Sequence, residues 1–456
     1  MKTYIKNFIL LCGLLVTFSC KKEFLDIKQN INQAVPQRIA DFQAVLDNSS
    51  EMNAASSHTL GQLGGDEFYL LDGRLSNIRD AYQRNSYIWA KEILDGGSCP
   101  DWNTAYRRIL LANLCLEGID KIKPSASEQA AWNTVKGSAL FFRAINFYQL
   151  AQEFCKPFDA STKDQDLGIS LRLESDISLK STRASVGATY QRIIQDLKAS
   201  ADLLPEKPQF KTRPSMAAAF AMLAKTYLLT GDYATAAQYA DRCLQINDYL
   251  IDLKTLKDLN QNFPLTEIAL EENRELIFHL IVTNSAPVAV ARFNISPGIY
   301  NRYETNDIRK QAWFFDYAGR VLFGGSYISG YCTGIGVNEV VLIRAECLAR
   351  TGSQARALED LNYLLRYRYN SSFIPLNIAG QNELLIRILE ERKKELVMRG
   401  TRWEDLRRLN KESRFAETLI RTIDGNTYQL PPNDPRYVYP IPDQEILMSG
   451  IPQNPR

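Results

Sequence analysis

The densest group of chemically capable side chains lies near the C-terminus, in the stretch ILEERKKELVMRGTRWEDLRRL. This stretch contains carboxylates, guanidinium groups and an indole that could resemble a catalytic cluster. They belong to Glu391, Arg392, Glu395, Arg402, Trp403, Asp405, Arg407 and Arg408. The spacing favours a structural interpretation. Glu391 and Glu395 lie four residues apart on one helical face, and Gly400 then ends that helix. We therefore expect charge pairs that hold the next helix against this one, rather than catalysis.

Other signatures of catalysis or metal binding are scarce. The chain has two histidines, His58 and His279, and it contains no HExxH, GxSxG or glycine-rich phosphate loop. Glycoside hydrolysis needs only two carboxylates, so 52 acidic residues leave that alternative open, although no pair stands out. These observations weigh against an enzyme, and no cofactor is expected.

The cysteines also argue against a metal site. Six cysteines follow Cys20, and no two of them have CxxC spacing. Three of them, Cys115, Cys243 and Cys347, occur within helical patterns, which predicts buried free thiols. If the protein is exported to an oxidising compartment, disulfides could form, but the sequence does not establish that any pair does.

Cys20 itself stands where an apolar run gives way to a charged one, in LLVTFSCKKEFLD. The run from 8 to 18 has about half of the roughly 20 residues that a helix needs to cross a bilayer, and the small residue Ser19 follows it. Residues 1–19 are therefore predicted to be a signal peptide. A cysteine directly after the cut predicts a bacterial lipoprotein whose Cys20 carries the lipid, although Thr17 replaces the usual aliphatic residue. An ordinary secreted protein with an incidental Cys20 is the alternative.

The mature chain would carry no net charge. Removing residues 1–19 takes away two lysines and no acids, which leaves 52 basic and 52 acidic residues. Nothing in this balance favours capture of nucleic acid or of an anionic surface. Residues 20–456 are numerous enough for a large core, and no second apolar run approaches membrane-spanning length.

Amphipathic helical runs with short breaks dominate the chain, which predicts a mostly α fold. In the clearest run, RPSMAAAFAMLAKTYLLTGDYATAAQYADRCLQI, two helical faces are separated by Gly231 and Asp232, as in a tetratricopeptide hairpin. The stretch EVVLIRAECLARTGSQARALEDLNYLL repeats the scheme around Gly352. Further helices are predicted over 101–122, 130–154 and 188–206, so we expect four such helix pairs.

The interval from 251 to 336 has a different character. It holds several prolines, the pair Gly324 and Gly325, and many aromatic and polar residues. We expect irregular structure with short strands there, which is the kind of segment that carries recognition on a rigid scaffold.

Taken together, these stretches resemble the SusD/RagB family of nutrient-binding lipoproteins. The resemblance runs through RIADFQAVLDNSS, YRRILLANLCLEGI, KGSALFFRAINFYQLAQEF, YETNDIR and LIRAECLARTG to the most specific pieces, ILEERKKELVMRGTRWEDLRRL and YVYPIPDQEILMSGIPQNP. It implies one SusD-like domain over 36–456 after a leader at 20–35, with helix pairs over about 36–250 and about 337–456. It also implies attachment to the outer membrane through Cys20 at the cell surface.

The resemblance further implies capture of an oligosaccharide or polysaccharide for a SusC-like TonB-dependent transporter. In SusD-like proteins the ligand surface is built from loops of the N-terminal third and from the segment before the C-terminal repeat. The aromatic and polar residues that this places at the site are Trp89, Trp102, Tyr300, Trp313, Tyr327, Asp66, Asn301 and Arg302. Flat rings would cover the C–H faces of a sugar and the polar groups would bind its hydroxyls.

Several residues and alternatives fall outside that expected site. The chain is shorter than many family members, so the aromatic platform is expected to be reduced. Trp132 and Trp403 are predicted to be core residues, and the YETNDIR motif is predicted to be structural. A peptide or glycopeptide ligand, or a scaffold that binds only protein, are the remaining alternatives.

Overall fold

The computed structural model describes residues 36–54, 59–282, 294–328 and 330–456. Its contacts divide the chain into two units, Met1–Arg38 and Ile39–Arg456, and the second unit holds every described helix and strand. The predicted signal peptide, Cys20 and His58 lie outside the described residues.

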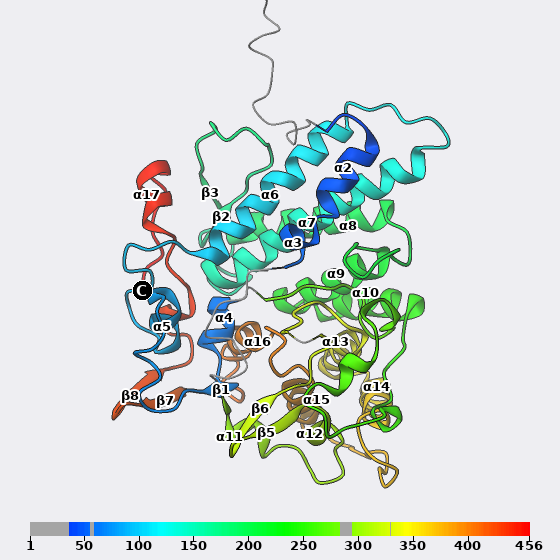
Figure 1. Cartoon of the computed structure of the whole chain (residues 1–456), viewed down its shortest axis with the longest axis vertical. Helices are drawn as coiled ribbons and strands as arrows, with labels where there is room; N and C mark the ends of the chain where they lie inside the picture. The colour runs from blue at the N-terminus through cyan, green and yellow to red at the C-terminus, as the bar shows by residue number, and fades with distance from the viewer. Residues whose placement is uncertain (1–35, 55–58, 283–293, 329) are drawn as a thin grey trace, which may run out of the picture. The chain divides into compact units, whose positions relative to one another are not determined.

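Helices form most of the regular structure of this unit, so the mostly α prediction is confirmed (Figure 1). The helices of eight or more residues are α2 (Ile39–Leu46), α6 (Pro100–Ile119), α7 (Gln129–Phe154), α8 (Val186–Leu203), α9 (Met216–Thr230), α10 (Tyr233–Ile246), α13 (Val337–Arg350), α14 (Gln354–Arg366), α15 (Gln381–Glu395) and α16 (Arg402–Leu409). The shorter ones are α3 (Ser49–Met52), α4 (Thr59–Gly64), α5 (Ala81–Tyr87), α11 (Pro297–Tyr300), α12 (Arg309–Ala312) and α17 (Asp443–Ser449).

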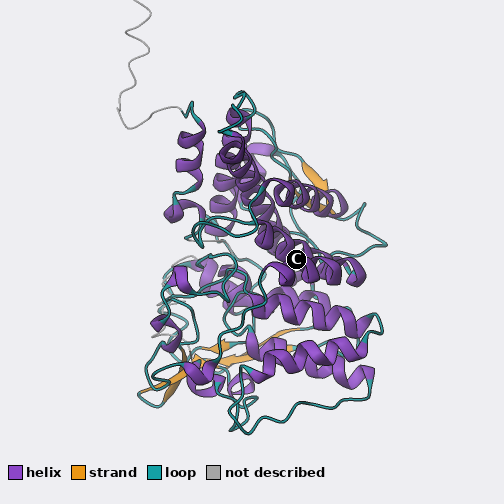
Figure 2. Ribbon diagram, turned by 90° about the vertical axis from the view of Figure 1, so that its right-hand side faces the viewer, coloured by secondary structure: helices purple, strands orange, loops and turns teal. Residues whose placement is uncertain are grey.

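The long helices pack in chain order. Each helix from α6 to α10 contacts the next one, α10 packs against α13, and α13 packs against both α14 and α15. Figure 2 shows these helices lying alongside one another, with the strands as short segments beside them. The predicted pairs α6–α7, α9–α10 and α13–α14 are therefore present, and the interruption between α10 and α13 falls in the interval predicted to be irregular.

The α9–α10 hairpin shows how the sequence sets these breaks. The Ser215 hydroxyl accepts a hydrogen bond from the Ala218 amide at 3.2 Å and so caps the start of α9. Gly231 ends α9 with φ +79°, a left-handed conformation that glycine adopts without a Cβ clash. Asp232 then caps α10 by accepting from the Thr235 amide at 3.1 Å. Buried alanines such as Ala218 and Ala224 let the two helices approach closely.

Among the described residues, the strands pair as four two-stranded antiparallel ribbons. They are β1 (Phe68–Tyr69) with β4 (Asn294–Ile295), β2 (Leu167–Ser170) with β3 (Arg183–Ser185), β5 (Phe314–Tyr317) with β6 (Arg320–Phe323), and β7 (Leu419–Ile423) with β8 (Asn426–Leu430). The β7–β8 turn places Asp424 at φ +53° and Gly425 at φ +75°, the left-handed pair that matches the twist of a tight hairpin.

The described parts of the interval 251–336 contribute most of a second, smaller apolar core. Short helical turns and strands there bury side chains such as Ile299, Trp313 and Tyr327 in one apolar cluster, which also receives residues from β1 and from 397–398. The larger cluster fills the space between the long helices. The ligand-bearing irregular segment expected from the sequence is thus irregular, but much of its aromatic content faces inward.

The six cysteines after Cys20 are all buried free thiols in this unit, as predicted for three of them. Within the described ranges, no helix combines the length and apolarity that crossing a bilayer would require.

Candidate ligand-binding cleft

A cleft of about 550 Å³ lies between three segments that are far apart in the sequence. Its floor is the first half of α6, one wall is the segment 171–182 between β2 and β3, and the other wall is α17. This volume falls within the roughly 300–1,000 Å³ typical of small-molecule sites. The side chains that line it are Trp102, Asn103, Tyr106, Arg107, Leu110, Arg172, Glu174, Ile177, Ser178, Leu179, Lys180, Ser181, Glu445, Met448 and Ser449.

Two aromatic residues form the floor. Trp102 and Tyr106 lie four residues apart on one face of α6, with ring centroids 4.7 Å apart. The Tyr106 hydroxyl donates to the Ser170 carbonyl at 2.9 Å and accepts from the Ser170 amide at 3.1 Å, which fixes β2 to α6. Burial raises the pKa of Tyr106, so the hydroxyl keeps the proton that it donates. The floor is therefore rigid.

The 171–182 wall is held in place by hydrogen bonds to α6 at its start and by hydrogen bonds within the segment. Asn113 of α6 donates to the backbone carbonyls of Arg172 and Glu174, at 3.0 and 3.1 Å. Arg172 in turn donates to the Asp176 carbonyl at 2.6 Å and also to that of Leu179. These contacts give the loop a defined shape against α6.

The third side, α17, is tied to the loop at one end of the cleft. Arg183 of β3 donates to the Pro452 carbonyl at 3.0 Å, just beyond α17. Gly450 ends α17 with φ +71°, and a Cβ placed there would lie 3.8 Å from the Lys180 ammonium. The two walls thus meet near Gly450.

The rim of the cleft carries polar side chains that can still form hydrogen bonds with a ligand. Within the part of the chain that the structure describes, Glu174, Lys180 and Glu445 form no ion pair, and the Asn103 side chain makes no hydrogen bond. Carboxylates accept, ammonium groups donate and an amide does both, so together these side chains can serve either kind of group on a ligand. The arrangement fits binding of a polar molecule with apolar parts.

The predicted aromatic platform is not present as a set. Trp89, Trp102, Trp313 and Tyr327 are only 2%, 4%, 4% and 3% exposed. Only Trp102 borders the cleft, and Trp89, Trp313 and Tyr327 lie elsewhere in the core. In this structure the four rings therefore offer little open face for stacking.

The three aromatic residues outside the cleft, Trp89, Trp313 and Tyr327, each have a partner within the protein that explains their burial. The Trp89 indole donates to the Gly64 carbonyl at 2.9 Å, and the Arg421 guanidinium lies 4.5 Å from its ring. The Tyr327 hydroxyl donates to Glu275 at 2.6 Å. Trp313 packs so closely against Gly325 that a Cβ there would lie 2.4 Å from the indole.

The remaining predicted residues are more accessible but lie apart from the cleft. Tyr300 is half-buried against Phe314, with ring centroids 5.4 Å apart, and Asn301 is exposed. Arg302 forms an ion pair with Glu390 of α15. These residues remain candidates for ligand contact at a second location.

The Asp66 carboxylate already forms ion pairs with two cationic side chains. It lies 2.6 Å from Arg402 and 3.2 Å from Lys393. Burial alone would raise the pKa of this carboxyl, but the two cations outweigh that effect and hold the pKa well below its usual range. Its charge is therefore largely used within the protein.

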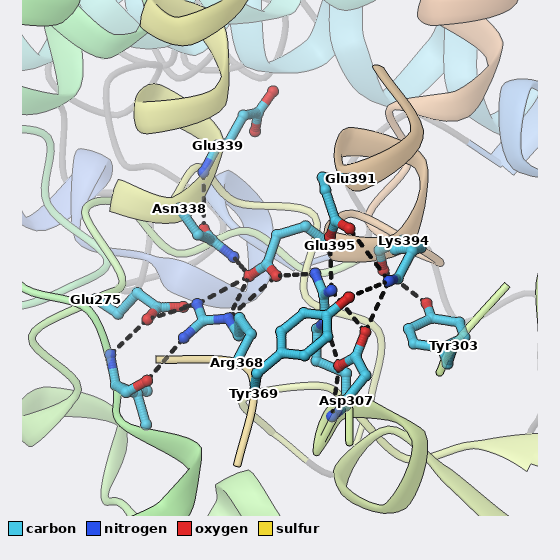
Figure 3. A network of polar contacts seen from close by, with 12 residues as sticks. Glu275, Tyr303, Asp307, Asn338, Glu339, Arg368, Tyr369, Glu391, Lys394 and Glu395 are labelled. Atoms are coloured by element: carbon cyan, nitrogen blue, oxygen red, sulfur yellow. Dashed lines mark hydrogen bonds and ion pairs between the residues drawn. The ribbon is translucent and has the colours of Figure 1, made fainter. Parts of the chain in front are cut away.

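Glu391, Lys394 and Glu395 of the charged C-terminal stretch belong to a network of polar contacts (Figure 3). None of them lines the cleft. Arg309 contacts Asp307, Glu391 and Glu395 at 2.7, 2.6 and 3.0 Å. Arg368 contacts Glu395 and Glu275 at 2.8 and 2.9 Å. All six side chains are at most 2% exposed.

A second set of contacts joins α15 to α16 and α16 to α7. Arg392 of α15 pairs with Asp405 of α16 at 2.8 Å, so the expected charge pair between the two helices is present. It does not use Glu391 or Glu395, which contact Arg309 and Arg368 instead. The guanidinium of Arg407 donates to backbone carbonyls at the C-terminal end of α7. The structural interpretation of this stretch is confirmed.

His279 is the one histidine among the described residues, since His58 lies outside them. His279 is buried, and burial together with Arg399 lowers its pKa to about 4. In the described ranges, no group of three or more His, Cys, Asp or Glu side chains is placed to hold a metal ion.

The residues of the cleft walls were not predicted from the sequence. Ile177, Leu179, Lys180, Glu445 and Met448 come from segments about 270 residues apart. The only local signal was the apolar pair Leu447–Met448 in a short helix, which is unusual at a surface.

Comparisons with known proteins agree along most of the chain. A SusD-like family model described as "Starch-binding associating with outer membrane" matches residues 23–228, and a model of the SusD family matches residues 337–456. A SusD-like protein of Formosa agariphila, P2, is 25% identical over 538 aligned residues that cover all of both chains.

Solved structures have the same fold. A putative sugar binding protein of Bacteroides vulgatus superposes with a TM-score of 0.76 at 22% identity, over 93% of this chain and 99% of that one. A laminarin binding SusD-like protein superposes with a TM-score of 0.66 at 20% identity, over 91% of this chain and 98% of that one.

Proposed function

The chain belongs to the SusD family, and we propose that it captures an oligosaccharide or polysaccharide at the cell surface and passes it to a SusC-like TonB-dependent transporter. As a family member it is a binding protein and not an enzyme. The matched family model is described as starch-binding and as associating with the outer membrane, and two structural relatives are described as binding sugar or laminarin. These descriptions support a saccharide ligand over a peptide.

The cleft between α6, the 171–182 segment and α17 is the proposed capture site. The observation that carries this proposal is the convergence of unpaired polar groups, from Asn103, Glu174, Lys180 and Glu445, around a rigid floor. Hydroxyl groups of a saccharide would satisfy these groups, and the apolar walls would cover its C–H faces. Capture is by binding alone, and the ligand leaves unchanged.

Titration of the chain carrying Cys20→Ser against a panel of oligosaccharides and peptides tests the proposal. We expect a saccharide to bind, and the double variant Asn103→Ala, Glu445→Ala to weaken its binding about thirtyfold, because each of the two lost hydrogen bonds contributes on the order of 1 kcal/mol. Both side chains are at least partly exposed, so the fold should be unaffected.

A matched variant separates the two candidate locations. Asn301→Ala with Arg302→Ala removes polar groups next to Tyr300, away from the cleft. If this pair weakens binding while the cleft pair does not, the site lies beside α11. Binding of peptides alone would replace the saccharide proposal with the peptide alternative.

Attachment to the outer membrane is proposed to occur through lipid on Cys20. We expect Cys20→Ser to move most of the protein from the membrane fraction to the soluble fraction, since no described helix can replace the anchor. Fractionation followed by immunoblotting measures this. Equal retention of both forms would show that something other than Cys20 holds the protein.

A further inference from the structure

The walls of the cleft expose aliphatic side chains to an unusual degree. Ile177 is 82% exposed, Met448 is 78% exposed and Leu179 is 45% exposed, and all three line the same cavity. Single exposed apolar residues are ordinary, but several that face one cleft mark a binding surface. A ligand that covers them must bring apolar groups of its own.

The aromatic floor offers little for flat stacking. Trp102 is 4% exposed and packs edge-on against Phe154, with ring centroids 5.0 Å apart at 85°. Tyr106 has its hydroxyl committed to Ser170. A sugar that carries only hydroxyl groups would therefore meet aliphatic walls without an open aromatic face, and its hydroxyls would lose water without full compensation.

The polar groups of the rim complete the pattern. Glu174 and Glu445 can only accept hydrogen bonds, Lys180 can only donate them, and Asn103 can do both. An acetamido group has one N–H donor, one carbonyl acceptor and one methyl group. The cleft has a counterpart for each: a carboxylate for the N–H, an ammonium or amide for the carbonyl, and an aliphatic wall for the methyl.

We propose that the cleft selects saccharides built from N-acetylated amino sugars. This inference rests on the proposed function, because it specifies the class of ligand at the same site. The cleft is lined by three cationic side chains, Arg107, Arg172 and Lys180, and by two carboxylates, Glu174 and Glu445. An uncharged acetamido group therefore suits it better than the free amine of a deacetylated sugar, which would add a further cation. The methyl group gains from burial against Ile177 and Met448.

Two oligosaccharides with the same backbone test this directly. Chitohexaose and cellohexaose share β-1,4 linkage and differ at C2, where one carries acetamido groups and the other hydroxyls. Calorimetric titration of the full chain with Cys20→Ser should show chitohexaose binding about tenfold or more tightly, from one buried methyl and its paired amide. The glucosamine hexamer should bind more weakly than chitohexaose.

Variants link the preference to the walls. Ile177→Ser with Met448→Ser should bring the affinity for chitohexaose close to that for cellohexaose. Ile374→Ser is the matched control, because Ile374 is 80% exposed but does not line the cleft, and it should leave the preference intact.

The outcomes separate this inference from the proposed function. If cellohexaose or another unacetylated saccharide binds as well as or better than chitohexaose, the saccharide proposal stands and the acetyl preference is wrong. If only peptides with aliphatic side chains bind, or if neither saccharides nor peptides bind, both fall. A preference for chitohexaose that survives Ile177→Ser with Met448→Ser would remove the cleft walls as its cause.

Discussion

Replacing Arg309 by methionine should destabilise the protein by about 3–5 kcal/mol, because it removes one partner from a buried ion network. The Arg309 guanidinium is fully buried and bonds to Asp307, Glu391 and Glu395. Burial alone would lower its pKa, but the carboxylates of Glu391 and Asp307 outweigh that effect and raise it well above its ordinary value. Without the cation, these carboxylates remain buried with too little positive charge nearby.

This loss is large compared with the roughly 5–15 kcal/mol by which native proteins are usually stable. Thermal or urea unfolding of the purified protein followed by circular dichroism measures it. Arg302→Met is the matched control, since the Arg302 and Glu390 side chains are 34% and 44% exposed. Exposed ion pairs contribute about 0–1 kcal/mol, so the control should unfold close to wild type. Equal effects of the two substitutions would contradict the role assigned to the network.

Replacing Trp403 by alanine should cost a similar amount, about 3–5 kcal/mol, through the cavity that it leaves. The indole is 2% exposed and packs against Tyr437 and Tyr439, with ring centroids 4.8 and 5.4 Å away. It also fits against α4, where a Cβ on Gly64 would lie 2.6 Å from the ring. Neighbours packed this closely cannot collapse easily into the space.

Trp132→Ala is the control for this substitution. Trp132 is only partly buried, and its indole donates one hydrogen bond to the Ile119 carbonyl at 2.9 Å. Its loss should cost about 1–2 kcal/mol. Urea midpoints for the two variants give the comparison, and a smaller loss for Trp403→Ala than for Trp132→Ala would show that the α4 contact is not tightly packed.

The helical part of the fold was predictable because its signals are local. A 3.6-residue apolar period, interrupted by Gly231 and by Gly352, places α9, α10, α13 and α14 without knowledge of their neighbours. A charge pair between α15 and α16 was likewise predictable, because a short connection joins the two helices, but the spacing of Glu391 and Glu395 did not indicate that Arg392 would make it.

The candidate site was less predictable, because its parts are set by distant contacts. In the interval 251–336 no period indicates which side of the chain faces inward. Trp313 is buried because Gly325 has no side chain, so the backbone there can approach the indole. Tyr327 is buried because its hydroxyl donates a hydrogen bond to Glu275. The cleft likewise forms only where α17 packs near the 171–182 segment, and nothing in the sequence of either segment indicates that the two are neighbours.

The buried ion network also bears on how this half of the protein reaches its native state. Its members extend from Glu275 to Glu395 and come from segments that are far apart in the sequence. An intermediate that lacked α15 would hold Arg309 and Arg368 without their shared carboxylate, and so would be unfavourable. The segments around the network should consequently fold and unfold as one cooperative unit, with few stable partly folded intermediates.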